Sequence, residues 1–257
     1  MANIMKTKPV SNTSKKMIAG ALTLLLALSY SCQAMADDTN DNSMSDEYHR
    51  DGLGLDIGTL GAGLDYVHAF WPGWHVRLGF DALSLNENQD SSGTIYNGNL
   101  NLSTIHTLID WYPMGTGLRL TAGLVLNNNT ISLSAVPDGS NSNGNYTDYT
   151  LNGNTYTSNQ IGGINATVGF QKLAPYFGVG YGNPLAAHGR LGMTADLGVL
   201  YQGNANENLT VTCASGLDAG TCSQIQSDAA AQRSADQSNL SRFGFYPVLS
   251  VSLYYLF

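Results

Sequence analysis

The sequence predicts an all-β fold, an eight-stranded antiparallel transmembrane β-barrel with short periplasmic turns and two long extracellular loops. Three features indicate it: a secretory signal at the start, period-two alternation of apolar with small or polar residues, and a last strand that ends on Phe257. Such alternation is typical of strands with one apolar face. An exported chain without long apolar helices crosses a bacterial outer membrane as a closed barrel, because closure satisfies every backbone polar group in lipid.

Residues 1–36 have the parts of a secretory signal peptide. Four lysines precede a 14-residue apolar run at 17–30, and an Ala-Met-Ala site follows at 34–36. The run is too short to span a bilayer comfortably as a helix, so a retained anchor is the weaker alternative. A lipoprotein signal at Cys32 is also weak, because Ser29 stands where such signals usually carry Leu.

The mature chain is acidic. Cleavage after residue 36 leaves 221 of the 257 residues, with all 19 acidic side chains and seven of the 11 Lys and Arg, a formal charge of about −12. This balance argues against nucleic acid as a partner, since phosphate binding needs Lys and Arg clusters. Residues 37–51 lack periodicity and are predicted to form a disordered periplasmic leader. The barrel domain is predicted at 52–257.

The first three strands are predicted at 52–58, 61–70 and 76–82. In each, apolar residues on one face alternate with glycine or charged residues on the other, as in the opening segment GLGLDIG. A tight turn near Thr59 joins the first two strands, and WPGW at 71–74 forms a Pro-Gly turn before the third.

Strands four and five are predicted at 104–111 and 118–124. A polar loop at about 86–99 precedes strand four, and PMGTG at 113–117 forms the turn between the two strands. The stretch at about 137–163 is rich in Asn, Ser, Gly, Thr and Tyr and is predicted as the first long extracellular loop.

Strands six, seven and eight are predicted at 175–182, 191–201 and 247–257, with the turn NPLAAHGR between the first two. The second long loop takes roughly 203–242. Apart from the tight turn near Thr59, short and long connections alternate, as they do in bacterial barrels.

Aromatic residues gather beside the short turns and predict an interfacial girdle on the periplasmic side. A soluble β-sandwich would share the alternation of the strands but does not explain this girdle. The six residues are Trp71, Trp74, Trp111, Tyr112, Tyr181 and Phe257.

The signal peptide, the eight strands and the terminal Phe257 resemble the small outer-membrane barrels of the OmpA-like and OmpX-like class, over about residues 52–257. In the last third, APYFGVGYGNP and ADLGVLYQGN are similar to CarO-type barrels, a group linked to uptake of small basic amino acids. The matching positions are Pro175, Tyr176, Gly178, Gly180, Gly198, Tyr201 and Gly203. The resemblance implies that the terminal strand, with Leu253, Tyr255 and Phe257, is the signal read by the barrel assembly machinery. It carries no catalytic residue.

Charged side chains collect on the inward faces of the predicted strands. One interpretation is a plug, in which two arginines bridge several aspartates in a lumen just wide enough for its own side chains. The other is a narrow cation-selective path, because five aspartates outnumber two arginines. The lumen charge network consists of Asp56, Asp65, Arg77, Asp81, His106, Asp110, Arg119 and Asp196.

No enzymatic site, cofactor site or metal site is predicted. His106 has no serine at a convincing position on its own face, and His68 lies near the periplasmic girdle, away from an outer-leaflet substrate. No histidine pair has the spacing typical of zinc sites. In GLGLDIG, Ile57 stands where a dinucleotide fingerprint needs its third glycine.

Cys213 and Cys222 are nine residues apart in the second long loop, and an oxidising compartment predicts a disulfide between them. Two free thiols are the alternative. The segment at 227–237 is a candidate short surface helix with Ser227 as its N-cap.

These observations predict a monomeric integral protein of the bacterial outer membrane, in contact with its lipid and lipopolysaccharide. Its lumen is expected to be closed by charges, and its extracellular loops to have a structural or surface-interaction role toward a ligand that the sequence does not name. The alternative function is a narrow channel for small cationic solutes such as basic amino acids.

Overall fold

A computed structural model describes residues 50–91, 94–113, 117–137, 148–186, 190–240 and 244–257. The predicted signal peptide at 1–36 and the predicted leader up to residue 49 lie outside these residues. Strand β1 begins at Asp51, the last residue assigned to the leader.

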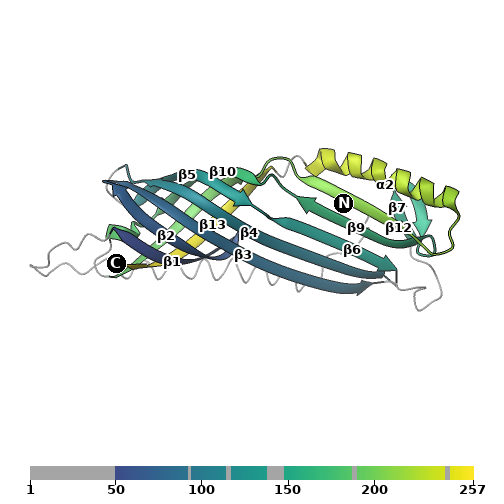
Figure 1. Cartoon of the computed structure of the whole chain (residues 1–257), viewed down its shortest axis with the longest axis horizontal. Helices are drawn as coiled ribbons and strands as arrows, with labels where there is room; N and C mark the ends of the chain where they lie inside the picture. The colour runs from purple at the N-terminus through teal and green to yellow at the C-terminus, as the bar shows by residue number, and fades with distance from the viewer. Residues whose placement is uncertain (1–49, 92–93, 114–116, 138–147, 187–189, 241–243) are drawn as a thin grey trace, which may run out of the picture. The chain divides into compact units, whose positions relative to one another are not determined.

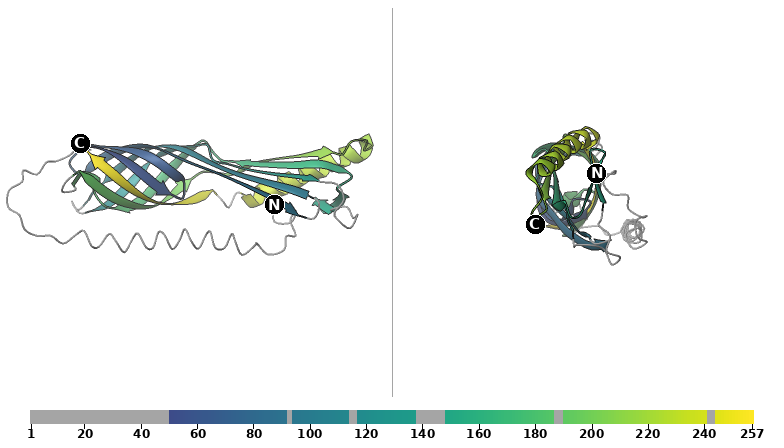
Figure 2. Two further views of the ribbon diagram at one scale, coloured as in Figure 1. Left: turned by 90° about the horizontal axis from the view of Figure 1, so that it is seen from below. Right: turned by 90° about the vertical axis from the view of Figure 1, so that its right-hand side faces the viewer.

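Eight antiparallel strands close into a ring, which confirms the predicted fold class (Figures 1 and 2). The ring closes where the last strand pairs with the first, with Leu256 opposite Gly52 and Ser250 opposite Gly58. In ring order the strands are β1 (Asp51–Gly58), β2 (Gly61–Trp71), β3 (Trp74–Ser91), β4 (Thr94–Trp111), β5 (Leu118–Asn127), β10 (Leu173–Tyr181), β11 (Leu191–Tyr201) and β13 (Phe245–Leu256).

The outer wall of the barrel is apolar. Along β1, Leu53, Leu55 and Ile57 are more than half exposed, while the residues between them face inward and are buried. An outward apolar band around a polar interior is the arrangement of a membrane-spanning barrel. Neither helix in the described part of the chain qualifies as a membrane span by its length and hydrophobicity.

The connections β2–β3, β4–β5 and β10–β11 meet at one end of the barrel, here called the short-turn end. The opposite end, which also carries the tight β1–β2 turn near Thr59, is the loop end. Aromatic side chains surround the short-turn end, where Trp71, Tyr181 and Phe257 are exposed and Trp74 stacks on Trp111 with ring centroids 5.6 Å apart. The short helix η2 (Pro184–Ala186) lies between β10 and β11 at this end.

Beyond the loop end the described chain forms strands and a helix. The prediction of irregular loops at 86–99, 137–163 and 203–242 was therefore wrong for most of these residues. Strands β3 and β4 continue as a hairpin past residue 86, and three further strands join them to form an open sheet, here called the extension (Figure 1). Its order is β12-β9-β6-β4-β3. The added strands are β6 (Thr130–Pro137), β9 (Ile161–Gly169) and β12 (Asn206–Cys213), and a separate hairpin is formed by β7 (Asp148–Leu151) and β8 (Asn154–Thr157).

The exchange of neighbours along β4 explains how one sheet leads into the other. Strand β4 pairs with β6 from Thr94 to Asn101 and with β5 from Thr104 to Trp111. At the junction, the backbone N–H of Ser103 donates to Asn129 Oδ1 over 2.9 Å, so a side chain continues the ladder where the neighbouring strand changes.

The predicted short helix at 227–237 is longer than expected and begins earlier. Helix α2 (Ala219–Leu240) is capped by Asp218, whose Oδ1 accepts from the N–H of Thr221 at 2.9 Å, so Ser227 is not its N-cap. The expected disulfide is present between Cys213, at the end of β12, and Cys222, in the first turn of α2.

Candidate functional site in the barrel lumen

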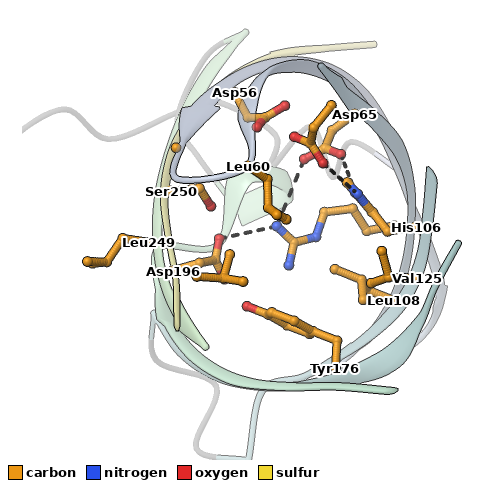
Figure 3. A pocket seen from close by; sticks show the side chains of 14 residues that line it. Asp56, Leu60, Asp65, His106, Leu108, Val125, Tyr176, Asp196, Leu249 and Ser250 are labelled. Carbon is orange, nitrogen blue, oxygen red and sulfur yellow. Dashed lines mark hydrogen bonds and ion pairs between the residues drawn. The ribbon is translucent and has the colours of Figure 1, made fainter. Parts of the chain in front are cut away.

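The eight charged residues expected to face inward all do so and are buried. Figure 3 looks into the ring and shows Asp56, Asp65, His106 and Asp196 projecting toward its centre from the surrounding strands. Because alternate residues of a strand face the lumen, the period-two pattern alone places these side chains inside.

Arg77, on β3, lies at the centre of the network. Its guanidinium is 3.2 Å from Asp110 Oδ1, 3.2 Å from Asp196 Oδ2 and 3.9 Å from Asp65 Oδ2. These three carboxylates come from β4, β11 and β2, so one side chain links separate walls of the barrel.

Arg119, on β5, forms a second bridge. It pairs with Asp196 and lies 3.7 Å from Asp110 through its Nε. Its Nη1 also donates to the backbone carbonyl of Gly182 at 3.2 Å, which ties the network to the short-turn end. Asp110 and Asp196 therefore each contact both arginines.

His106 holds the other half of the network. Its Nε2 is 2.7 Å from Asp65 Oδ1, and its Nδ1 is 3.2 Å from Asp81 Oδ2. Two hydroxyl groups complete the set, since Thr104 donates to Asp81 at 2.9 Å and Tyr254 donates to Asp65 at 2.9 Å.

Asp56 is the carboxylate of the network that pairs with neither the arginines nor His106 among the ion pairs of the described residues. Its carboxylate lies with that of Asp81 over Gly63, where a Cβ would collide with both. Gly79 likewise leaves space for Asp65 and His106, since a Cβ at Gly79 would overlap both side chains. Glycine at these positions leaves the space that the charged groups occupy.

Apolar side chains close both sides of the charged layer. At the short-turn end, Leu185 of η2 is almost fully buried among residues from β2 and β13. That cluster contains Val67, Ala69, Leu185, Tyr254 and Leu256. The loop-end cluster contains Leu60, Leu108, Val125, Ala174, Tyr176, Leu200 and Val248.

A small cavity lies between the charged residues and the loop-end cluster. Its volume is about 40 Å³, and it is lined by apolar side chains and by six members of the charge network: Asp56, Asp65, Arg77, Asp81, His106 and Asp196 (Figure 3). A space of this size holds one or two water molecules and no larger solute.

Several lumen residues escaped the sequence prediction. Tyr112 was expected in the aromatic girdle, but it is buried, with its ring 4.7 Å from that of His75 and its hydroxyl 3.4 Å from Arg119 Nη1. Its strand ends at Trp111, so the alternation no longer reports its direction. The period-two pattern places Tyr254 on the same face as Ser252, and it would place Tyr176 on the same face as Gly178.

The proposed assembly-signal residues lie on the outer wall. Leu253, Tyr255 and Phe257 are each about half exposed on the terminal strand. The N–H of Phe257 donates to the carbonyl of Asp51 at 3.0 Å and extends the pairing that closes the ring.

In the described part of the chain, no group of three or more His, Cys, Asp and Glu side chains is placed to hold a metal ion.

Known proteins share this fold. The structure is similar to CarO from Acinetobacter baumannii, with a TM-score of 0.53 and 17% identity over 83% of this chain and 100% of that one. It is also similar to CarO2 from Acinetobacter baumannii, with a TM-score of 0.52 and 20% identity over 80% of this chain and 98% of that one. The chain therefore has the fold of outer-membrane β-barrels. The sequence matches no protein-family model, and no curated protein matches it.

Proposed function

We propose that the protein is an integral outer-membrane barrel with a closed lumen, which holds its extension and α2 at the cell surface for a structural or surface-interaction role. The observation that carries this proposal is the lumen itself. Its charges are paired across the barrel, apolar clusters lie on both sides of them, and the remaining cavity is about 40 Å³.

Electrostatics favours a permanent plug over a transient one. The side chains of Arg77, Asp110 and Asp196 are each less than 5% exposed. Separating such groups leaves uncompensated charges in a space with little water, which costs several kcal/mol per ion. Opening a path along the barrel would require that separation.

The parts beyond the loop end are ordered enough to present a defined surface. Helix α2 packs on β12, and Asp228 of the helix accepts hydrogen bonds from Tyr156 and from Asn154 at 2.7 Å, both on β8. These donors, Tyr156 foremost, lower the pKa of Asp228 to about 2, so its carboxylate remains charged and bonded at neutral pH.

The apolar outer wall and the terminal strand indicate which partners the barrel is expected to contact. The apolar band is expected to contact membrane lipid and lipopolysaccharide, and the terminal strand to contact the barrel assembly machinery. The ring has closed on itself, so pairing its edges requires no second copy, and the barrel is expected to be a monomer.

A narrow channel for small cationic solutes is the second candidate. The specific observation in its favour is that four carboxylates outnumber Arg77 and His106 in the lining of the cavity. For this function the Arg77 bridges would have to exchange with hydration water often enough to let a cation pass.

Planar-bilayer conductance of the refolded mature chain distinguishes the two functions. We expect no stable unitary steps under conditions in which a general porin, reconstituted in parallel, conducts. Stable steps that favour cations would overturn the closed lumen and support the channel.

A further inference from the structure

The outer face of the extension carries a regular array of uncharged polar side chains, here called the polar grid. The strand register sets five of them side by side, one from each strand, in a central row. That row is Asn86, Asn99, Ser132, Thr167 and Asn208. Neighbours in such a row are about 5 Å apart, as cross-strand pairs are.

A second row lies two residues further along each strand. It consists of Asn88, Asn97, Ser134, Asn165 and Thr210. Rows on one face of a sheet are roughly 7 Å apart. Side chains also bond along the rows, since Asn99 donates to Asn86 and Asn97 donates to Ser134 over 3.4 Å. These two bonds orient the amides of Asn86, Asn97 and Asn99.

The third row, nearest the membrane, runs from Ser84 through Asn101 and Thr130 to Gly169 and Asn206. Eight of the 15 positions in the three rows are Asn, and none is Lys, Arg, Asp or Glu. Asn is depleted in strands, and exposed sheet surfaces usually carry charges, so secondary structure and solubility do not account for this composition. A ligand that selects uncharged polar groups would account for it.

The grid continues the lipid-facing wall of the barrel. On β4 the outward series passes from Ile109 and Ile105 to Ser103 and Asn101, and on β3 it passes from Phe80 to Ser84. The grid therefore begins where the apolar band ends. Its furthest row, at Asn88, is about 27 Å along the strand from Phe80, or roughly 20 Å above the apolar band at the usual barrel tilt.

The chemistry of the grid excludes several occupants. It has no cation for phosphate and no carboxylate for metal ions. Its three rows also lack aromatic and aliphatic anchors. The next row of the same face adds only Ile95 and Val136 beside the charged Asp90, which is too little apolar surface for the centre of an interface with another protein or a second copy. Amides and hydroxyls at regular spacing suit a ligand that is itself neutral and rich in hydroxyl groups.

We propose that the polar grid binds the neutral sugars of glycolipids in the outer leaflet of the surrounding membrane. The grid faces sideways from the barrel wall and extends outward from the headgroup layer, so the saccharides that project from neighbouring lipids would lie against it. The inference rests on the proposed surface location of the extension, and it does not depend on whether the lumen conducts.

Hydrogen exchange in nanodiscs tests the proposal. The mature chain is reconstituted with phospholipid plus either lipid A or rough-type lipopolysaccharide that has a neutral-hexose core. We expect the amides of 84–101 to exchange several-fold more slowly in the discs that carry the core sugars. The triple variant Asn97→Ala, Asn99→Ala, Asn101→Ala should lose this difference.

The matched control removes three polar groups from the exposed face of α2, by Ser223→Ala, Gln226→Ala and Ser227→Ala, and should keep the full difference. Equal exchange of the unaltered chain in both discs would overturn the proposal, as would protection that survives the β4 triple variant.

Protection that rises with protein density would assign the grid to a second copy. Protection by soluble dextran in lipid A discs would assign it to an external glycan. Either result would refute the proposal, and bilayer conductance of the same samples reports separately on the lumen.

Discussion

Replacing Arg77 by Met tests the charge plug most directly. Methionine retains much of the side-chain volume and removes the charge, so the loss of pairing is separated from the creation of a cavity. Asp110 and Asp196, each 3.2 Å from the guanidinium, would then share the single positive charge of Arg119.

The structure sets the size of the expected effect. Arg77 and its two nearest carboxylates are almost fully buried, and breaking a buried pair by removing one partner costs about 3–5 kcal/mol. The control is Arg190→Met, because Arg190 makes an exposed hydrogen bond of 2.9 Å to Tyr255 on the outer wall. An exposed interaction of this kind contributes about 0–1 kcal/mol.

The assay is reversible urea unfolding in lipid vesicles, followed by the heat-dependent shift in gel mobility of the folded barrel. Adding Asp110→Asn to Arg77→Met should recover at least about 1 kcal/mol, since residues in one ion-pair network couple by up to about 3 kcal/mol. A loss below about 1 kcal/mol for Arg77→Met, with no recovery in the double variant, would show that the arginine is hydrated. The plug would then be the wrong description of the lumen.

Three further outcomes are expected outside the lumen. Deleting Phe257 should sharply reduce insertion while leaving export intact, and normal amounts of heat-modifiable barrel in the outer membrane would contradict this. Replacing Cys213 and Cys222 by Ser should remove roughly 2–3 kcal/mol from the extension and speed surface proteolysis with the barrel intact; two alkylatable thiols in the unreduced protein would show that the clip does not form. Because the pKa of Asp228 is lowered to about 2, its bond to Tyr156 should stabilise α2 above about pH 4 and weaken as the pH falls toward 2. Asp228→Asn should abolish this acid dependence in hydrogen exchange of 219–240, and an unchanged acid profile would show that another group controls it.

The barrel could be predicted from the sequence because a membrane wall makes alternation unambiguous. In β1, every second residue from Leu53 to Ile57 must be apolar to face lipid, and the residues between must fit a narrow lumen. The inward direction of Arg77 and Arg119 follows from that pattern. Their partners do not, because they depend on strand tilt and stagger across the ring, which the pattern of a single strand does not report.

The extension could not be predicted in the same way. Segments such as Thr130–Pro137 and Asn206–Cys213 carry Asn, Ser and Thr on one face, so their composition is typical of loops. They become strands because β3 and β4 project beyond the barrel and offer an edge to pair with. The start of α2 was missed because Gly220 lies in its first turn and lowers its helix propensity.

The two faces of β4 exchange character near one height, and we expect the membrane boundary there. Toward the short-turn end, the outward Ile105 is apolar and the inward Thr104 is polar; toward the extension, the outward Asn101 is polar and the inward Leu102 is apolar and buried. A membrane barrel needs apolar residues outside, whereas a sheet in water needs them inside, against its own core. We therefore expect β4 to cross from lipid into water between Thr104 and Leu102, with Thr107, Leu108 and Ile95 as exceptions to the two patterns. The polar grid begins on the aqueous side of that point, so the alternation that builds the barrel wall would also set the grid beside the headgroups of the membrane.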